Sequence, residues 1–260
     1  MKRFSANISM LFAERPLLDR FQAARDAGFT GVEIQFPYDT PIDTLVAAKE
    51  RAGVGISVIN LPVGDMLSGG PGIAAMPGRE KEFEAATRQA LSYAAALKPR
   101  NVNVLSGWPP AELPRERCLA TLAGNLKHAA AAMAEIGVRL VVEAVNRRDR
   151  PGFFLGSSAE AIEAMDRAGH PNIGLEYDLY HMQIAEGDLV PTMRRLIARI
   201  GHIQFADTPG RHEPGTGEIN FPFVFDAIEA AGYDGWLAAE YVPSTKRTED
   251  CLGWLKPYRA

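Results

Sequence analysis

The sequence predicts an α/β protein that folds as a single (β/α)8 barrel, a TIM barrel, over residues 1–260. Helix-like segments that end in a glycine-containing turn are followed repeatedly by short apolar strands, as in AARDAGFTGVEI, AEIGVRLVVE and EAAGYDGWLAAE. Glycine is a frequent left-handed terminator of helices. Eight strand candidates occur in the chain, and eight such repeats typically need about 250 residues.

The expected strands alternate with helical segments along the whole chain. The strands are expected at Phe4 to Asn7, Val32 to Phe36, Ile56 to Asn60, Val102 to Leu105, Leu140 to Glu143, Ile173 to Asp178, His202 to Ala206 and Trp236 to Tyr241. The helices between them include Pro16 to Ala27, Glu80 to Leu97, Arg115 to Ile136, Ser158 to Ala168, Leu189 to Ile200 and Phe221 to Ala231. A doubly wound open sheet is the alternative, but the first strand lacks the glycine fingerprint of a dinucleotide-binding version.

Composition excludes several classes of protein. With 47% apolar and 23% charged residues, the chain can bury a substantial core as one domain. The net charge of -4 and the scattered basic residues argue against nucleic-acid binding. No apolar run approaches the roughly 20 residues of a membrane span. The amino terminus is a poor secretory signal, and two distant cysteines, Cys118 and Cys251, favour reduced thiols in the cytoplasm.

Four successive expected strands carry a carboxylate or an amide at or near their carboxyl end, namely Glu143, Asp178, Gln204 and Glu240. Burying an unpaired carboxylate costs several kcal/mol. Because the carboxyl ends of barrel strands meet at one mouth, the four side chains can converge on a shared partner. Their oxygen atoms suit Mg²⁺ or Mn²⁺ better than a structural zinc. Separate ion pairs are the alternative for each position.

Two further glutamates lie within strands, and neither is assigned to catalysis. Glu33 could point inward or face an arginine beneath the mouth, and Glu176 is expected in a second layer. His202 shares the alternation of Gln204, so it should lie one layer deeper as a hydrogen-bonded core histidine.

The motifs FPYD, NLPVGD, GIAAMPGRE, YDLYHMQ, GHIQFAD, EPGTGEIN and AAEYVP follow one another over nearly the whole chain. In this combination the chain resembles the hydroxypyruvate isomerase family of xylose-isomerase-like barrels. The resemblance implies that Glu143, Asp178, Gln204 and Glu240 bind a divalent cation and that Glu143 and Glu240 transfer protons. Related ketose 3-epimerases tend to carry histidine where this chain has Gln204, which favours the isomerase branch.

Such an enzyme would convert hydroxypyruvate to tartronate semialdehyde through an enediolate. The cation would stabilise the intermediate as a Lewis acid, and two carboxylates would move the proton between neighbouring carbons. No nucleotide cofactor is expected, since neither GxGxxG after a strand nor GxxxxGK[ST] occurs.

Two residues are predicted to contact the substrate. His181 should lie in a loop above the metal, where the family resemblance favours a substrate contact over loop packing. Arg211 either neutralises a substrate carboxylate or is a solvent-exposed loop arginine.

Three other activities stay open at this point. A four-carbon 2-oxo acid could replace hydroxypyruvate, and a ketose 3-epimerase would use the same enediolate chemistry. A hydrolase of the endonuclease IV type shares the barrel but needs several metals, many histidine ligands and a basic groove. The sequence does not decide the metal, the substrate length or whether the chain forms a homo-oligomer.

Overall fold

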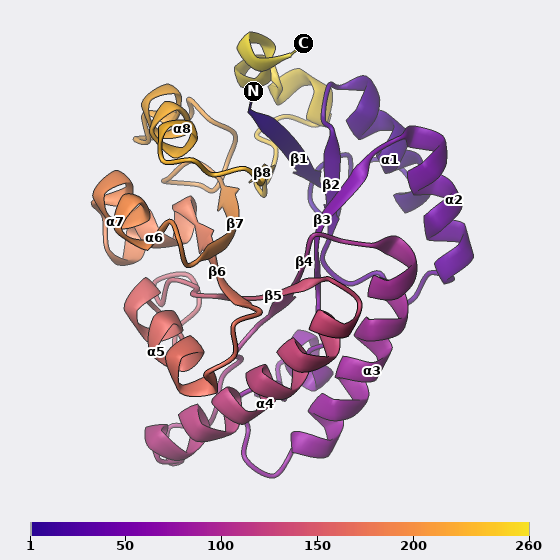
Figure 1. The fold of residues 1–260 in the computed structure, drawn as a ribbon. Coiled ribbons are helices and arrows are strands. Elements are labelled where there is room, and N and C mark those ends of the chain that lie inside the picture. The colour runs from indigo at the N-terminus through magenta and orange to yellow at the C-terminus, as the bar shows by residue number, and fades with distance from the viewer. Residues whose placement is uncertain (1, 260) are drawn as a thin grey trace.

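The computed structural model describes residues 2–259, and its strands form a closed parallel barrel in the order β1 to β8. The helices surround the strands on the outside (Figure 1). The predicted (β/α)8 architecture is therefore confirmed. The strands are β1 (Arg3–Asn7), β2 (Gly31–Ile34), β3 (Gly55–Asn60), β4 (Asn101–Val104), β5 (Arg139–Glu143), β6 (Ile173–Asp178), β7 (Ile200–Phe205) and β8 (Trp236–Ala239).

The outer layer contains α-helices and three short 3-10 segments. The α-helices are α1 (Leu17–Asp26), α2 (Ile42–Ala52), α3 (Glu80–Leu97), α4 (Arg115–Glu135), α5 (Ser158–Ala168), α6 (Leu179–Ala185), α7 (Leu189–Leu196) and α8 (Phe221–Ala230). The 3-10 segments are η1 (Gly64–Ser68), η2 (Thr248–Cys251) and η3 (Gly253–Tyr258). None of the helices within residues 2–259 is long and apolar enough to cross a membrane.

Most expected boundaries fall within a few residues of the observed ones, and α3 and α5 match them fully. The expected glycine terminator is seen after α2, where Gly53 has φ 64° and takes the left-handed conformation. Two differences concern the site. Strand β8 ends at Ala239, so Glu240 follows it, and the segment after β6 continues directly as helix α6.

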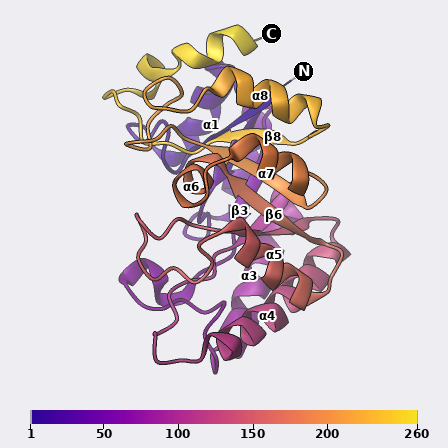
Figure 2. The same cartoon turned by 90° about the vertical axis from the view of Figure 1, so that its left-hand side faces the viewer.

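The barrel closes between its first and last strands, and this seam is packed with aromatic rings. Strand β1 pairs with β8 from Arg3 opposite Trp236 to Ala6 opposite Ala239. Rings from β1, β7, α8 and η3 pack edge to face behind the seam, including Phe4, Phe205, Phe225 and Trp254. Both views place the two chain ends side by side (Figure 2). Parallel closure brings every strand's carboxyl end to the same mouth.

Candidate active site

Strand pairing brings together the polar side chains that end β5 to β8. Glu143 ends β5 and Asp178 ends β6, and Asp178 pairs in register with Gln204 on β7. Glu240 follows β8, and all four side chains are buried. Glu143 and Glu240 line a cavity of about 330 Å³ at this mouth. The structure thus places the four predicted residues at the same end of the barrel, as the strand-end pattern predicts.

The Glu240 carboxylate is held from three directions. Its Oε1 accepts hydrogen bonds from the side-chain amides of Asn7 and Gln35, both at 2.9 Å. Its Oε2 accepts from the guanidinium of Arg211 at 2.5 Å. These donors come from the ends of β1 and β2 and from the loop after β7. A carboxylate with this many donors keeps a fixed orientation toward the cavity.

Gln204 has its amide orientation set by a neighbouring carboxylate. Its Nε2 donates to Glu33 Oε2 at 3.0 Å, which is possible only with the nitrogen on that side. The opposite atom, Gln204 Oε1, is buried and accepts no hydrogen bond. The amide oxygen is therefore available as a ligand.

One carboxylate oxygen of Asp178 accepts a hydrogen bond, and the other accepts none. Its Oδ1 accepts from the backbone N–H of Tyr180 at 2.8 Å and so caps the amino end of α6. Its Oδ2 is buried without a hydrogen-bond partner and lies 3.6 Å from His181 Nε2 and 3.7 Å from Arg211. On the neighbouring strand β5, Glu143 Oε2 accepts a hydrogen bond from Asn103.

The partners of His181 determine its tautomer. The amide of Asn146 accepts from the Asp149 N–H through its oxygen, so the nitrogen of that amide faces His181 Nδ1 at 2.7 Å. Nδ1 is then the acceptor, and the ring proton is on Nε2. That Nε2–H points toward Glu143 Oε1, 3.7 Å away, and Asp178. His181 lies in the first turn of α6, so the predicted loop position is wrong.

Burial is the largest influence on the pKa values of the site. It raises the pKa of Glu240 to about 7, against the opposing effect of Arg211. Burial and the adjacent carboxylates of Glu240 and Asp178 raise the pKa of Glu143 well above its ordinary value. Burial also raises the pKa of Asp178 and holds the pKa of His181 well below 6.5, the latter with help from Arg211. The imidazole is therefore neutral at physiological pH.

The donor set fits a divalent cation. Oxygens of Glu143 and Asp178 and a ring nitrogen of His181 lie within 4.8 Å of one another. A buried acceptor without a partner costs about 1–3 kcal/mol, and both Asp178 Oδ2 and Gln204 Oε1 are in this state. A hard cation with oxygen ligands would satisfy them. The proton on His181 Nε2 makes this residue a hydrogen-bond donor rather than a ligand.

Arg211 is not the solvent-exposed loop arginine of one sequence alternative. Its side chain is 23% exposed, and its guanidinium contacts Glu240 and Asp178. The residue takes a left-handed backbone conformation with φ 57°, which turns the side chain of this loop into the mouth. Arg211 Nε is buried without a hydrogen-bond partner and can still donate.

A second layer of polar residues lies beneath the mouth. Glu33 contacts His202 Nε2 and Gln204 Nε2, so the alternative in which Glu33 faces an arginine is wrong. The expected role of His202 as a hydrogen-bonded core histidine is confirmed. Both carboxylate oxygens of Glu176 are buried without a hydrogen bond. Burial and the nearby Glu143 and Glu33 raise its pKa well above the ordinary value, which favours its protonated form.

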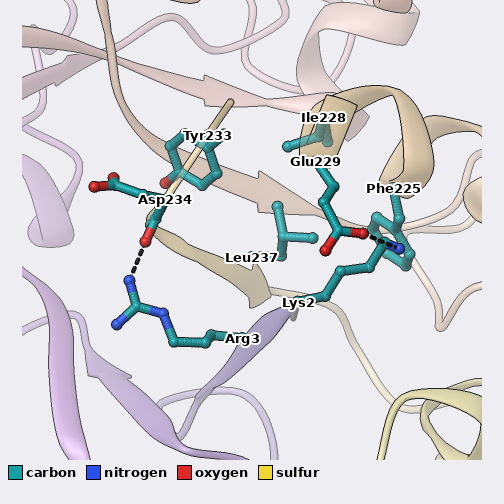
Figure 3. Close-up of a pocket in the computed structure, with 9 residues that line it drawn as sticks. Lys2, Arg3, Phe225, Ile228, Glu229, Tyr233, Asp234 and Leu237 are labelled. Atoms are coloured by element: carbon teal, nitrogen blue, oxygen red, sulfur yellow. Dashed lines mark hydrogen bonds and ion pairs between the residues drawn. The ribbon is translucent and has the colours of Figure 1, made fainter. Parts of the chain in front are cut away.

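Another cavity, of about 320 Å³, lies at the amino end of β1 and β8 (Figure 3). Its charged groups pair with one another. Lys2 binds Glu229 at 2.7 Å, and Arg3 donates to the backbone oxygen of Asp234. The strand-end oxygens, with the unsatisfied acceptors of Asp178 and Gln204, are at the opposite end of the barrel, which we therefore take as the candidate site.

The supporting amides were not predicted from the sequence. Asn7, Gln35 and Asn103 lie at or just after the ends of β1, β2 and β4, and each donates to a carboxylate of the site. The pattern that identified the site residues of β5 to β8 was a polar side chain near the end of an apolar strand. The same pattern was therefore also present in the first half of the chain. Asn146, which orients His181, follows β5 by three residues.

Comparison with known proteins places this barrel in a class. Residues 21–258 match the family model described as xylose isomerase-like TIM barrel. The chain is 44% identical over 259 residues to a hydroxypyruvate isomerase of Escherichia coli (strain K12), with full coverage of both chains. It is 43% identical to a 2-oxo-tetronate isomerase of Cupriavidus necator, covering 99% of each.

Solved structures share the architecture. A crystal structure titled AP endonuclease, family 2, from Brucella melitensis is 40% identical, covers 100% of both chains and superposes with a TM-score of 0.96. An L-ribulose 3-epimerase structure, 24% identical, has a TM-score of 0.83 with 99% and 93% coverage and is similar in fold alone. The fold and the site together define a xylose isomerase-like TIM barrel. Within that class, the chain belongs to the hydroxypyruvate isomerase family.

Proposed function

We propose that this protein is a metal-dependent isomerase of a small hydroxy-keto acid, with hydroxypyruvate as its leading substrate and tartronate semialdehyde as the product. The observation that carries the proposal is the pair Glu143 and Glu240, two buried glutamates on the wall of one cavity beside the uncommitted oxygens of Asp178 and Gln204. The relatives named for hydroxypyruvate and 2-oxo-tetronate isomerisation support the same substrate class.

The proposed metal ligands are Glu143, Asp178, Gln204 and Glu240, and the proposed ion is Mg²⁺ or Mn²⁺. When bound, the cation supplies Lewis-acid stabilisation of the negative charge that develops on the substrate oxygens. An all-oxygen donor set of three carboxylates and an amide favours these hard ions. The protein's own cation, Arg211, pairs with Glu240 and offsets part of the repulsion among the carboxylates.

Glu143 and Glu240 are proposed to transfer the proton between neighbouring carbons. One carboxylate takes a proton from C3 of hydroxypyruvate, the C–H electrons form a C2=C3 double bond, and the carbonyl oxygen gains the negative charge. The other glutamate then gives a proton to C2 while the hydroxyl proton on C3 passes to the C2 oxygen, which leaves an aldehyde at C3. Raised pKa values, about 7 for Glu240, allow these groups to hold and release a proton near neutral pH.

His181 and Arg211 are proposed to bind substrate oxygens. Neutral His181 presents Nε2–H between Glu143 and Asp178, where a substrate hydroxyl or carbonyl oxygen can accept it. Arg211, which lines the same cavity, retains a free Nε–H. Both donors are fixed by other contacts, so they lose little freedom on binding.

The other activities have less support. A four-carbon 2-oxo acid differs from hydroxypyruvate by one hydroxymethyl group, and the two named relatives match the chain almost equally well. An epimerase is disfavoured by the amide at Gln204. A hydrolase of the type named for the Brucella relative would need several histidine ligands, and His181 is the only histidine that lines the mouth cavity in the described part of the chain.

Two buried free thiols, Cys118 and Cys251, agree with the proposal of a reducing cytoplasmic location.

The test is proton NMR in D2O with the Mg²⁺-loaded or Mn²⁺-loaded protein and a panel of three- and four-carbon hydroxy-keto acids. The true substrate is expected to gain solvent deuterium at the carbon beside the carbonyl. Glu143→Gln and Glu240→Gln should each lower this exchange by at least about a hundredfold, the usual scale for losing an acid or base. Glu84→Gln, on the exposed face of α3, is the matched control.

Metal content and circular dichroism of each variant separate loss of proton transfer from loss of the ion or the fold. Normal exchange in both glutamine variants would overturn the proton-transfer assignment. Exchange that persists fully after chelation of the metal would overturn the metal dependence.

A further inference from the structure

The loop after β5 carries three arginines with different environments. Arg147 donates to the backbone oxygens of the following turn and binds Glu160 at 2.8 Å. Arg148 binds Asp149 at 3.5 Å and is 58% exposed. The guanidinium of Arg150, by contrast, makes no hydrogen bond or ion pair with any residue in the range 2–259. The sequence NRRDR therefore contains one arginine whose charge is not matched by the protein.

Arg150 lies on the wall of the mouth cavity. It lines the cavity together with Glu143, His181, Arg211 and the apolar Trp108. Arg150 is exposed, as unpaired arginines usually are, but it also lines the cavity of the candidate site.

The backbone around Arg150 is held in place. Its N–H donates to the Asn146 carbonyl, and its own carbonyl accepts from the Phe153 N–H, both at 3.1 Å. Asn146 also contacts His181, so the turn that carries Arg150 is tied to the residue that faces the proposed metal ligands. The backbone that carries the Arg150 side chain is thus held at the mouth.

The neighbouring acids do not pair with Arg150. Asp149 accepts from Tyr180 and Asn146 and pairs with Arg148. Glu143 and Glu240 lie among the proposed ligands, and Glu176, the third acid of the cavity lining, is buried without a hydrogen bond to any residue in the range 2–259.

The charges of the cavity leave one role for such a cation. Arg211 already contacts two of the proposed ligands, Glu240 and Asp178, through its guanidinium. A substrate carboxylate brings a further negative charge into the cavity. Arg150 is the remaining cation of the cavity lining, and a guanidinium suits bidentate contact with a carboxylate.

We propose that Arg150 binds the carboxylate of the substrate and makes the site selective for hydroxy-keto acids over neutral ketoses. This inference rests on the proposed function, because it assumes that the reacting carbons lie at Glu143 and Glu240. The proposal also gives the two arginines of the cavity different roles. Arg211 orients Glu240 and contacts oxygens near the reacting carbons, while Arg150 receives the acid group at the outer wall.

The test measures binding of two compounds that cannot isomerise. Glycerate has the carboxylate and two neighbouring hydroxyls, and glycerol has a hydroxymethyl group in place of the carboxylate. Calorimetry with the Mg²⁺-loaded protein compares wild type, Arg150→Gln and Arg148→Gln. Arg148→Gln is the matched control, since it removes the same charge from the same loop at a side chain already paired with Asp149.

Arg150→Gln is expected to weaken glycerate binding by roughly tenfold to a hundredfold, the loss that follows from removing hydrogen bonds to a charged group. Glycerol binding should not change, and Arg148→Gln should leave both affinities as in wild type. In turnover, Arg150→Gln should raise KM for hydroxypyruvate more than it lowers kcat. Arg150→Lys should recover part of the glycerate affinity, since lysine keeps the positive charge but lacks the planar guanidinium that makes a bidentate contact.

The outcomes separate the two proposals. If Arg150→Gln binds glycerate as tightly as wild type does, the carboxylate assignment is overturned, whether or not hydroxypyruvate is isomerised. An equal loss in Arg148→Gln would also overturn it, because the effect would then be one of overall charge. If glycerate affinity depends on Arg150 but no hydroxy-keto acid exchanges deuterium, the proposed function fails and the acid-binding role stands.

Discussion

At the scale of single residues, neutral amides and one arginine control the chemistry of the acidic groups. Asn7 and Gln35 direct their amide nitrogens at Glu240 Oε1, and Arg211 contacts Oε2. These contacts favour the ionised form, yet burial outweighs them and raises the pKa of Glu240 to about 7. The residue is thus close to equally protonated and ionised at neutral pH.

This raised pKa predicts a pH-dependent stability of the metal-stripped protein. A carboxyl whose folded pKa is about 7 and whose ordinary value is 4.5 stabilises the fold below pH 4.5, and the contribution is lost as pH rises through 7. Relative to Glu240→Gln, wild type should therefore lose about 2 to 3 kcal/mol of unfolding free energy between pH 5 and pH 8. Urea unfolding of both proteins across this range measures the difference.

The glutamine variant cancels the contributions of titrating groups that do not interact with Glu240. The difference between the two proteins therefore reports Glu240 together with its effect on the pKa of Glu143. A difference that stays constant from pH 5 to pH 8 would contradict the raised pKa. A wild type that gains stability over the variant as pH rises would show the opposite shift, with Arg211 dominating over burial.

The site residues at strand ends were predictable from the sequence. A site residue that is recognised only by its lack of an ion-pair partner was not. An acid such as Glu143 after a run of buried apolar residues stands out because its burial must be compensated. Arg150 does not stand out, since NRRDR is the composition of an ordinary solvated loop. Which of its arginines is paired depends on Glu160 and Asp149, whose positions are fixed only by the folded loop and α5.

At the scale of elements, Asp178 serves both β6 and α6. It is the last residue of the strand and the amino-terminal cap of the helix, with one oxygen on the Tyr180 N–H and the other facing the site. The seven-residue helix α6 was not predicted because it is too short to show the apolar periodicity of a helix over two full turns. Its sequence YHMQIA is equally compatible with a loop. Its first turn is what positions His181.

The dual role of Asp178 predicts that stability and metal binding can be separated. Asp178→Asn keeps a capping oxygen and should change stability little while weakening Mg²⁺ or Mn²⁺ binding through the loss of one charge. Asp178→Ala should weaken the metal equally or more and also lose about 0.5–2 kcal/mol from the cap. Urea unfolding of the metal-stripped proteins and calorimetric metal titration measure the two effects.

The cap of α5 provides the control. Ser157 accepts from the Glu160 N–H in the same way but lies outside the mouth cavity. Ser157→Ala should cost a similar capping energy and leave metal affinity unchanged. Equal metal affinity in Asp178→Asn and wild type would remove Asp178 from the ligand set.

At the scale of the whole molecule, the site spans the closure of the barrel. Glu240 follows β8, while Asn7 and Gln35, which hold it, come from β1 and the end of β2 across the seam. The proposed ligands extend this network through β5, β6 and β7. A bound ion would therefore connect both sides of the closed sheet, and its binding energy should stabilise the barrel as one unit.

This arrangement predicts a single unfolding transition that moves as a whole with metal. At a free Mg²⁺ or Mn²⁺ concentration about 100 times Kd, stability should rise by about 2.7 kcal/mol, or roughly 5–10 °C in Tm for a chain of this size.

Trp108→Phe leaves Trp236 and Trp254, away from the mouth cavity, as the fluorescent reporters. Their transition and the far-UV circular dichroism should coincide and shift together, and Asp178→Ala should reduce the shift. Two separate transitions would contradict the single-domain prediction, and a metal shift absent from the tryptophan signal would confine stabilisation to the mouth.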